Sequence, residues 1–302
     1  MLGMTAVVTG GTEGVGRATA HALASRGARV IVVGRDPAKT AATVTALTQA
    51  TGNTQLCGEL ADLSVQADVE ALADRLLAAE PRIDVLINNA GALFTDRALT
   101  IDGIERTFAL NHLAYMQLTL RLLPRLLASA SPGAPARVLC VSSRAHSEAR
   151  LDLADLQLTR GYGGWRAYGR SKLCNILFVR ALARRVNPEQ LVVHALHPGV
   201  VATRFAQSGN GWRGQLMRRV MDLISISPTA GADTVVWLAT DPAATRESGA
   251  YWVTRRSVAP SRIAQDAALA DALWEASAAL LPPWARTVTP RAAGDAGVSP
   301  RP

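Results

Sequence analysis

The chain has 302 residues, of which 49% are hydrophobic and 19% are charged, so it can bury the core of one large α/β domain or two small ones. No run of 18 or more apolar residues occurs and the segment before the first motif is too short for a signal peptide, so we expect no membrane association. The net charge is +8, but the arginines are scattered rather than gathered in a stripe, which argues against nucleic-acid binding.

Short apolar runs rich in β-branched residues alternate along the chain with longer amphipathic segments. The runs that we expect as strands are 5–9, 29–33, 55–59, 84–87, 137–141, 192–196 and 250–253. The segments that we expect as helices are 15–26, 37–51, 65–79, 103–127, 165–185 and 229–239. Repeated strand–helix units predict an α/β, single-domain Rossmann fold, a doubly wound parallel sheet of about seven strands with helices on both faces.

A glycine-rich turn separates the first predicted strand from the first predicted helix. Glycines there allow the backbone to approach a pyrophosphate closely, and the helix N-terminus presents free N–H groups to the anion. The spacing Gly-x-x-x-Gly-x-Gly differs from the six-residue dinucleotide fingerprint, and a turn without a ligand is the alternative. The residues that we expect to contact a dinucleotide in this turn are Gly10, Thr12, Glu13, Gly14, Val15 and Gly16.

The second predicted strand ends at Gly34-Arg35-Asp36. An acidic residue at such a tip would bind the adenosine ribose, but glycine occupies that position and Arg35 follows it. A guanidinium pairs well with a 2′-phosphate, so we predict NADP(H) rather than NAD. Asp36 and Glu13 bring negative charge nearby and count against this prediction, and Arg35 as an exposed loop residue is the alternative.

Polar residues also follow the third and fourth predicted strands, at the edge of the sheet where ligands of such folds bind. Asp62 and Leu63 border the adenine in one interpretation, and in the other Asp62 is the N-cap of the next helix. Asn88 and Asn89 precede Ala90 and Gly91, and they organise a turn, contribute to the cofactor site, or do both. We predict cofactor contacts for Asn89, Ala90 and Gly91.

Ser143 precedes Tyr168 by 25 positions, and Lys172 follows the tyrosine by four. Residues four apart share one face of a helix, so the lysine ammonium should lie near the phenol and lower its pKa toward the neutral range. Such a tyrosine is a usable general acid or base. The alternative is a surface Tyr/Lys pair on an amphipathic helix. Only Lys39 and Lys172 among 32 Lys+Arg residues are lysines.

The motifs together resemble those of the classical short-chain dehydrogenase/reductase superfamily, and most closely its retinol-dehydrogenase-like branch. The resemblance runs from about residue 5 to residue 280 and includes the glycine-rich turn, Asn88-Asn89-Ala90-Gly91 and Pro198-Gly199. Branch-specific features are the long interval between Ser143 and Tyr168 and the segments 171–178 and 197–201. Ala114-Tyr115 and Gly169-Arg170 depart from the branch pattern, which argues against a retinoid substrate.

The resemblance implies roles for individual residues. Tyr168 exchanges a proton with the substrate oxygen, Ser143 hydrogen-bonds that oxygen, with Ser142 as its rival, and Lys172 also holds the nicotinamide ribose. Asn111 resembles the asparagine that anchors a water in the proton relay, whereas His197 is interpreted as a packing residue. The residues expected to line the nicotinamide are Pro198, Gly199, Val201 and Thr203.

The predicted function is that of an NADP(H)-dependent oxidoreductase that interconverts a carbonyl and an alcohol. A lid around 200–227, rich in large apolar residues, favours reduction of a bulky and largely apolar ketone or aldehyde. Its arginines allow an acidic substrate group instead, or they lie on solvated helix faces. The alternatives for the whole protein are a C=C or C=N reductase and a non-catalytic NADP sensor or scaffold.

Residues 1–285 are predicted to form the NADP-binding domain, and 286–302, rich in Ala, Gly and Pro, a loose tail. Cys57, Cys140 and Cys174 are far apart and odd in number, so we predict neither a disulfide framework nor a metal site, and a cytoplasmic location. The resemblance further implies a homodimer or homotetramer, which pairs through the helices that precede and carry the tyrosine motif.

Overall fold

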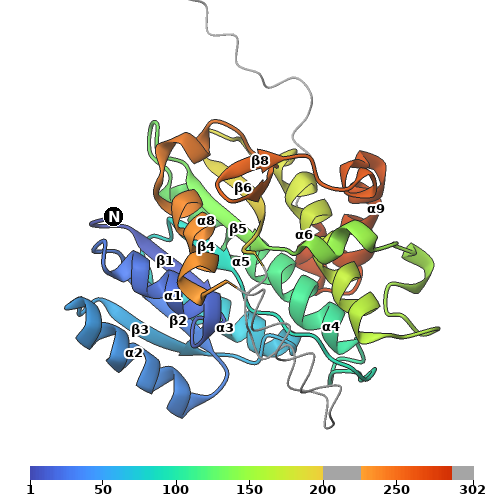
Figure 1. Cartoon of the computed structure of the whole chain (residues 1–302), viewed down its shortest axis with the longest axis horizontal. Helices are drawn as coiled ribbons and strands as arrows, with labels where there is room; N and C mark the ends of the chain where they lie inside the picture. Colours follow the sequence, from blue (N-terminus) through green and yellow to red (C-terminus); the bar gives the residue numbers. More distant parts are fainter. Residues whose placement is uncertain (200–225, 288–302) are drawn as a thin grey trace, which may run out of the picture.

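Eight strands form one sheet in the order β3-β2-β1-β4-β5-β6-β7-β8 in this computed structural model, which describes residues 1–199 and 226–287 (Figure 1). The first seven strands are parallel and β8 pairs antiparallel with β7. The strands are β1 Thr5–Thr9, β2 Arg29–Gly34, β3 Leu56–Leu60, β4 Val85–Asn88, β5 Ala136–Val141, β6 Leu191–His197, β7 Tyr251–Val253 and β8 Arg256–Val258. The predicted α/β fold and its parallel sheet are confirmed.

Helices lie on both faces of the sheet, as predicted (Figure 1). They are α1 Gly14–Ala24, α2 Pro37–Thr51, α3 Gln66–Ala79, α4 Arg106–Phe108, α5 Ala114–Ser129, α6 Gly164–Ala183, α8 Pro228–Thr240 and α9 Ala267–Ala278. The helix α2 shows why the boundaries were predictable: Asp36 caps its N-terminus by accepting from the Lys39 N–H, Pro37 opens it, and Gly52 ends it at φ 68°.

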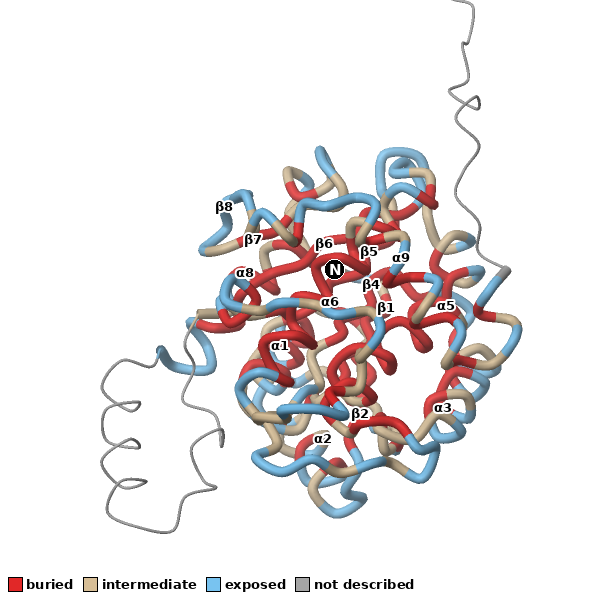
Figure 2. Tube along the Cα trace, turned by 90° about the vertical axis from the view of Figure 1, so that its right-hand side faces the viewer, coloured by how far each residue is buried: buried red, intermediate tan, exposed pale blue. Residues whose placement is uncertain are grey.

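Strand residues alternate between two hydrophobic cores. Val7 and Ile31 point to the core shared with α3, α5, α6 and α9, whereas Val8 and Val32 point to the core shared with α1, α2 and α8. In Figure 2 the central strands are buried along their length and exposed segments gather on the outside. Because both faces of the sheet centre are covered, strands β1, β2, β4, β5 and β6 are nearly continuous apolar runs, whereas the outer strand β3 alternates in burial.

The strand order reverses between β1 and β4, which are neighbours in the sheet although β2 and β3 separate them in the sequence. In open α/β sheets, ligands bind at such a switch point, outside the carboxyl ends of the strands. The glycine-rich turn follows β1, and Asn89 follows β4. The fold therefore brings two of the sequence motifs together at the switch point.

The strand β8 is an addition to the predicted sheet. It is joined to β7 by Thr254 and Arg255, which adopt φ angles of 47° and 59°. Two-residue hairpin turns of this kind usually contain Asn or Gly, since these residues tolerate the left-handed region. All three residues of β8 are exposed, so neither a turn signal nor an apolar pattern marks this strand in the sequence.

The predicted helix 103–127 is wrong in two respects. It begins only at Arg106, because the Glu105 carboxylate accepts hydrogen bonds from the Thr107 and Phe108 N–H groups. It is also interrupted by a π-helical turn, Ala109–Leu113, before α5 begins. Such turns insert one extra residue into a helix and are frequent at functional sites; this one carries Asn111.

The helix α9 was not predicted, and it packs against α6. The Phe178 and Trp274 rings stack at 5.7 Å, and Asp271 of α9 accepts from Arg184 and Arg185 at the end of α6. Fifteen of the 20 residues of α6 are buried within this single chain. Helix α6 therefore leaves little exposed surface through which two copies could pair. The oligomeric state stays a prediction.

Two segmental predictions fall largely outside the described part of the chain. The lid predicted around 200–227 reaches it only at Ile226 and Ser227. The predicted domain end at 285 falls inside a 3-10 turn, Pro283–Thr287, so the first two residues of the predicted tail belong to that turn. Within 1–199 and 226–287, none of the helices is both long and apolar enough to cross a membrane.

Candidate active site

The glycine-rich turn leaves no room for side chains at two positions. A Cβ at Gly16 would overlap the Gly10 carbonyl oxygen and lie 2.5 Å from the Asn89 amide nitrogen. A Cβ at Gly10, where φ is 62°, would lie 2.8 Å from the Ala90 Cα. The turn is thus pressed against the residues that follow β4, which fits the close approach that a dinucleotide pyrophosphate requires.

Asn89 fastens the glycine-rich turn to β4. Its Nδ2 donates to the Thr9 and Gly10 carbonyl oxygens at 2.9 and 3.2 Å, while the Thr9 hydroxyl accepts from the Asn89 and Ala90 N–H groups. The turn-forming interpretation of this motif therefore holds. The predicted cofactor contacts of Asn89, Ala90 and Gly91 stay predictions, and these residues lie at the switch point where such contacts are made.

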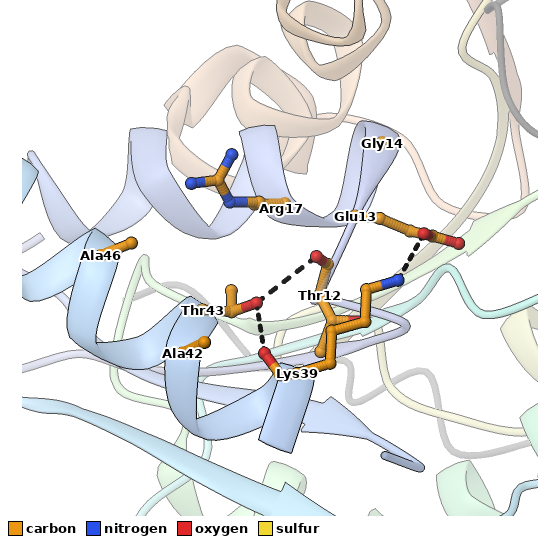
Figure 3. Close-up of a pocket in the computed structure, with 8 residues that line it drawn as sticks. All are labelled: Thr12, Glu13, Gly14, Arg17, Lys39, Ala42, Thr43 and Ala46. Carbon is orange, nitrogen blue, oxygen red and sulfur yellow. Dashed lines mark hydrogen bonds and ion pairs between the residues drawn. The ribbon is translucent and has the colours of Figure 1, made fainter. Parts of the chain in front are cut away.

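The N-terminus of α1 has no side-chain cap, since Glu13, the N-cap residue, makes no capping hydrogen bond, and the first N–H groups of a helix have no partner within it. The Glu13 carboxylate instead accepts from the Lys39 ammonium on α2, as Figure 3 shows. Both flank a cavity of 380 Å³ between α1 and α2, into which Arg17 also faces. Its lining residues are Thr12, Glu13, Gly14, Arg17, Lys39, Ala42, Thr43 and Ala46.

The end of β2 cannot accept an acidic side chain at position 34. A Cβ at Gly34 would overlap the Thr40 hydroxyl and lie 2.6 Å from the Thr12 Cγ2. Arg35 is exposed, and it makes no ion pair with any other described residue. The Asp36 carboxylate faces the α2 N-terminus, where it accepts from the Lys39 N–H at 2.8 Å.

Asp62 is not the N-cap of α3, because that position is occupied by Val65. The Asp62 carboxylate closes a local turn instead, accepting from the Ser64 N–H and hydroxyl at 2.9 and 2.7 Å. Leu63 is buried in the core beneath β1 and β2. Contact between this turn and an adenine stays a prediction.

Tyr168 and Lys172 lie one turn apart on α6 and meet at the carboxyl end of β5. The Lys172 Nζ is 5.5 Å from the centre of the Tyr168 ring and donates to the Val141 carbonyl oxygen at 3.0 Å. Both side chains are buried, with Lys172 only 3% exposed. The interpretation of this pair as a surface feature of an amphipathic helix is therefore wrong.

The pKa of Tyr168 differs from the sequence-based expectation. Burial raises it to about 12, and the hydrogen bond with Ser143 is the opposing influence, rather than the charge of Lys172. Burial also lowers the pKa of Lys172 to about 8, because an ammonium loses hydration in this site. Near neutral pH the tyrosine therefore holds its proton, and the lysine is mostly charged.

Ser143 and its rival Ser142 point in different directions from the end of β5. The Ser142 hydroxyl is buried and donates to the Lys172 carbonyl oxygen at 2.7 Å, which joins β5 to the backbone of α6. Ser143 faces Tyr168, with which it shares a hydrogen bond. The structure thus uses Ser142 as a tether, and Ser143 is the serine that lies next to the tyrosine.

Asn111 reaches the site from the π-helical turn. Its amide donates to the Ala92 carbonyl at 2.9 Å and to the Ser171 hydroxyl at 3.0 Å, and its Oδ1 accepts from the Ala92 N–H at 2.9 Å. A Cβ at Gly91 would lie 3.2 Å from the Asn111 Oδ1 and 3.3 Å from the Lys172 Nζ. Gly91 therefore lies in close contact with both side chains, and a larger residue there would press against them. The water-anchoring role of Asn111 stays a prediction.

Three residues near the site were not predicted from the sequence as functional candidates. Tyr115 is 1% exposed, with its ring centre 5.6 Å from the Lys172 Nζ. The His146 Nδ1 donates to the Ser143 carbonyl at 2.7 Å, and its Nε2 accepts from the Ser261 N–H at 3.1 Å. The Trp165 ring lies 5.8 Å from that of Tyr168 and is 58% exposed. Their positions in the site result from contacts between distant segments, so no local sequence motif identifies them.

Pro198 and Gly199 follow β6 at the same edge of the sheet. Gly199 has a φ of 92°, and a Cβ there would overlap the Ile226 side chain. Val201 and Thr203, the other two predicted nicotinamide contacts, lie outside the described residues. His197 is 6% exposed beside these residues, as expected for a packing residue at a strand end.

Comparisons with known proteins place this chain in a family. The profile of the short chain dehydrogenases matches residues 4–214. The Streptomyces sp. (strain C5) protein named "Putative daunorubicin C-13 ketoreductase DnrU" is 41% identical over 94% of both chains, and retinol dehydrogenase 12 of Mus musculus is 37% identical over 92% of this chain and 86% of its own length.

Solved structures agree with these matches. An uncharacterized protein from Mycobacterium paratuberculosis superposes with a TM-score of 0.73 at 34% identity, covering 92% of this chain and 93% of its own. The Pseudomonas aeruginosa RhlG/NADP active-site complex does so with a TM-score of 0.68 at 29% identity, covering 83% and 94%. The present chain thus belongs to the short-chain dehydrogenase family of oxidoreductases and is similar to its retinol dehydrogenases.

Proposed function

We propose that this protein is an NADP(H)-dependent oxidoreductase that reduces a bulky, largely apolar ketone or aldehyde to an alcohol. The observation that carries the proposal is the meeting of Ser143, Tyr168 and Lys172 at the carboxyl edge of the sheet, next to the residues that pack against the glycine-rich turn. A relative is named as a ketoreductase, and other relatives as retinol dehydrogenases, which is consistent with carbonyl–alcohol chemistry.

In this proposal NADPH supplies the hydride when it is bound, and the protein supplies the proton and the orientation. The Tyr168 hydroxyl donates its proton to the carbonyl oxygen, and the Ser143 hydroxyl hydrogen-bonds the same oxygen and stabilises its developing negative charge. Lys172 provides positive charge beneath the phenol, and Asn111 holds the backbone at Ala92 in place.

Reduction is the direction that the protonation states favour. Tyr168 carries its proton at neutral pH, because burial raises its pKa to about 12. Lys172 has a pKa lowered to about 8, so its charge is present at pH 7 and is lost as the pH rises through that value. Proton donation assisted by the ammonium should therefore weaken above about pH 8.

Three features of the α1–α2 side support NADP(H) over NAD(H). Gly34 has no space for an acidic side chain that would repel a 2′-phosphate. The two acids that counted against the phosphate are engaged elsewhere, Asp36 with the α2 N-terminus and Glu13 with Lys39. Arg35 is exposed and free of ion pairs within the described residues, so its guanidinium is available to an anion.

Substitution Arg35→Asp should raise the dissociation constant of NADPH about tenfold to a hundredfold, since a charge-assisted hydrogen bond contributes about 1.5–3 kcal/mol. The dissociation constant of NADH should change less than about threefold, as NADH has no phosphate for the guanidinium to bind. Titration of both coenzymes by fluorescence measures this. Arg256→Asp, at an exposed arginine of β8, is the matched control. Equal weakening of both coenzymes contradicts the 2′-phosphate role.

The exposed Trp165 ring beside Tyr168 supports an apolar substrate. Trp165→Ala should raise the KM of bulky aromatic ketones about three- to tenfold, because an aromatic pair contributes about 0.5–1.5 kcal/mol. The KM of a two- or three-carbon aldehyde, which is too small to reach the ring, serves as the internal control. An equal rise for both substrates would show that the substitution disturbs Tyr168 rather than a substrate contact.

The proposed activity is tested by following NADPH absorbance against a panel of ketones, aldehydes, enones and imines. Consumption of NADPH with carbonyl compounds, together with formation of the alcohol, supports the proposal. Consumption only with enones or imines replaces it with reduction of a C=C or C=N bond. Binding of NADPH without turnover across the panel overturns catalysis and favours a sensor or scaffold.

A further inference from the structure

We infer that a buried hydrogen-bond chain, which starts on α9 and ends at the carbonyl that holds Lys172, positions this lysine for the proposed reaction. The inference rests on the proposed function for the importance of the lysine, but the chain itself is a property of the fold. Its members, from the periphery inward, are Ser277, His112, Asn175 and Val141.

Each link of this chain has a defined donor. The Asn175 Nδ2 donates to the Val141 carbonyl at 3.4 Å, so its Oδ1 faces His112 and accepts from the His112 Nδ1 at 3.3 Å. Burial lowers the pKa of His112 to about 4, so the imidazole is neutral and carries a single N–H. Its Nε2 is then an acceptor, and the Ser277 hydroxyl donates to it at 3.0 Å.

The hydrogen-bond chain ends at the Val141 carbonyl oxygen, next to Lys172 of the candidate active site. The Val141 carbonyl oxygen accepts both from Asn175 and from the Lys172 ammonium, at 3.4 and 3.0 Å. His112 is the next residue after Asn111 in the π-helical turn. The three polar side chains are completely buried, and buried networks of this kind fix a single arrangement because each unpaired member would be costly. Helix α9 is therefore connected to both Lys172 and Asn111.

Among the residues that the structure describes, two titratable side chains besides Tyr168 face the Lys172 ammonium, Tyr115 from α5 and Cys140 from β5. Burial raises the pKa of Cys140 to about 12 and that of Tyr115 well above its ordinary value. Neither group ionises between pH 6 and 9 on this basis. The charge on Lys172 in that range therefore depends on its burial and on the position of the Val141 carbonyl.

The test uses the fact that Lys39 and Lys172 are the only lysines in the amino-acid sequence. NMR titration of the full-length protein, labelled with 13C at lysine Cε, reports the pKa of Lys172 without any substrate, and Lys39→Arg assigns the two signals. Ser277→Ala should lower the pKa of Lys172 by about half a unit, since loss of one hydrogen bond loosens the carbonyl that stabilises the ammonium. Ser277→Thr, which keeps the hydroxyl, should restore the wild-type value.

His112→Phe should lower the Lys172 pKa at least as far, and the double variant with Ser277→Ala should shift it no further, since both changes break the same chain. Ser248→Ala is the matched control, because this hydroxyl binds the Val193 N–H on β6 and takes no part in the chain. If the Lys172 pKa stays constant in Ser277→Ala and His112→Phe while their thermal stability falls as in Ser248→Ala, the chain is merely structural and the inference is wrong.

Turnover gives the second reading. If the wild-type enzyme is active, the Ser277→Ala variant should show a basic limb of its kcat/KM–pH profile whose apparent pKa is lower than that of wild type by the same amount, about half a unit. A wild-type protein that reduces no carbonyl overturns the proposed function, whereas the NMR titration still decides the inference. An active enzyme whose pH profile and Lys172 pKa are unchanged by Ser277→Ala overturns the inference alone.

Discussion

Replacement Tyr168→Phe should lower kcat for carbonyl reduction about 10²- to 10⁴-fold, the range that general acid catalysis contributes. The substitution removes only the hydroxyl that lies beside Ser143, and the ring that fills the buried space next to Lys172 is kept. The dissociation constant of NADPH should therefore change little. Single-turnover kinetics and coenzyme titration measure these two quantities separately.

Tyr162→Phe is the matched control for this prediction. The Tyr162 hydroxyl lies 3.2 Å from the Thr107 hydroxyl and donates to the Phe94 carbonyl oxygen, so the same atom is removed from a half-buried tyrosine outside the proposed site. We expect its turnover to stay within about threefold of wild type, because the lost hydrogen bond contributes to folding stability and not to proton transfer. Unchanged turnover in Tyr168→Phe would remove the proton-donor role.

Gly16→Ala should abolish measurable dinucleotide binding and destabilise the protein by about 1–3 kcal/mol, the usual effect of overpacking. The added methyl group would overlap the Gly10 carbonyl oxygen and lie 2.5 Å from the Asn89 amide nitrogen, so α1 must shift away from β4. That shift opens the turn and moves the helix N-terminus that should face the pyrophosphate. Coenzyme titration and urea unfolding measure the two effects.

Gly163→Ala provides the comparison for Gly16→Ala. A Cβ at Gly163 would meet nothing nearer than the Arg166 Cβ at 4.0 Å, and the residue has an extended backbone that alanine adopts readily. Stability should change by less than about 1 kcal/mol and coenzyme affinity should stay at the wild-type level. If Gly16→Ala binds NADPH as well as Gly163→Ala does, the glycine-rich turn is not the pyrophosphate site.

The parallel sheet was predictable because its information is local. Most of the parallel strands are short apolar runs, and helix α2 has its cap, its proline and its terminal glycine within the segment itself. Even α9, which was missed, carries a local signal, since Asp266 caps it by accepting from the Leu269 N–H. The strand β8 carries none, because its turn residues are unusual for their φ angles and its side chains are exposed.

The residues of the candidate site could be predicted from the sequence, but their burial and their pKa values could not. Spacing of four residues placed Lys172 next to Tyr168, but it also predicted a lowered tyrosine pKa, whereas burial raises it. Burial depends on how α5, α6 and β5 pack around the pair, and this is absent from a helical repeat. The π-helical turn that presents Asn111 was likewise invisible, because one inserted residue hardly alters a hydrophobic pattern.

The sequence by itself determined the succession of strands and helices, the glycine turn and the identity of the residues at the sheet edge, since each depends on neighbours a few positions away. Only the tertiary structure decided that Ser142 tethers α6, that Gly34 excludes an acid, and that Ser277 connects through His112 to the carbonyl beside Lys172. These features join segments that are 30 to 165 residues apart or depend on close packing, and distances of this kind are set when the chain folds.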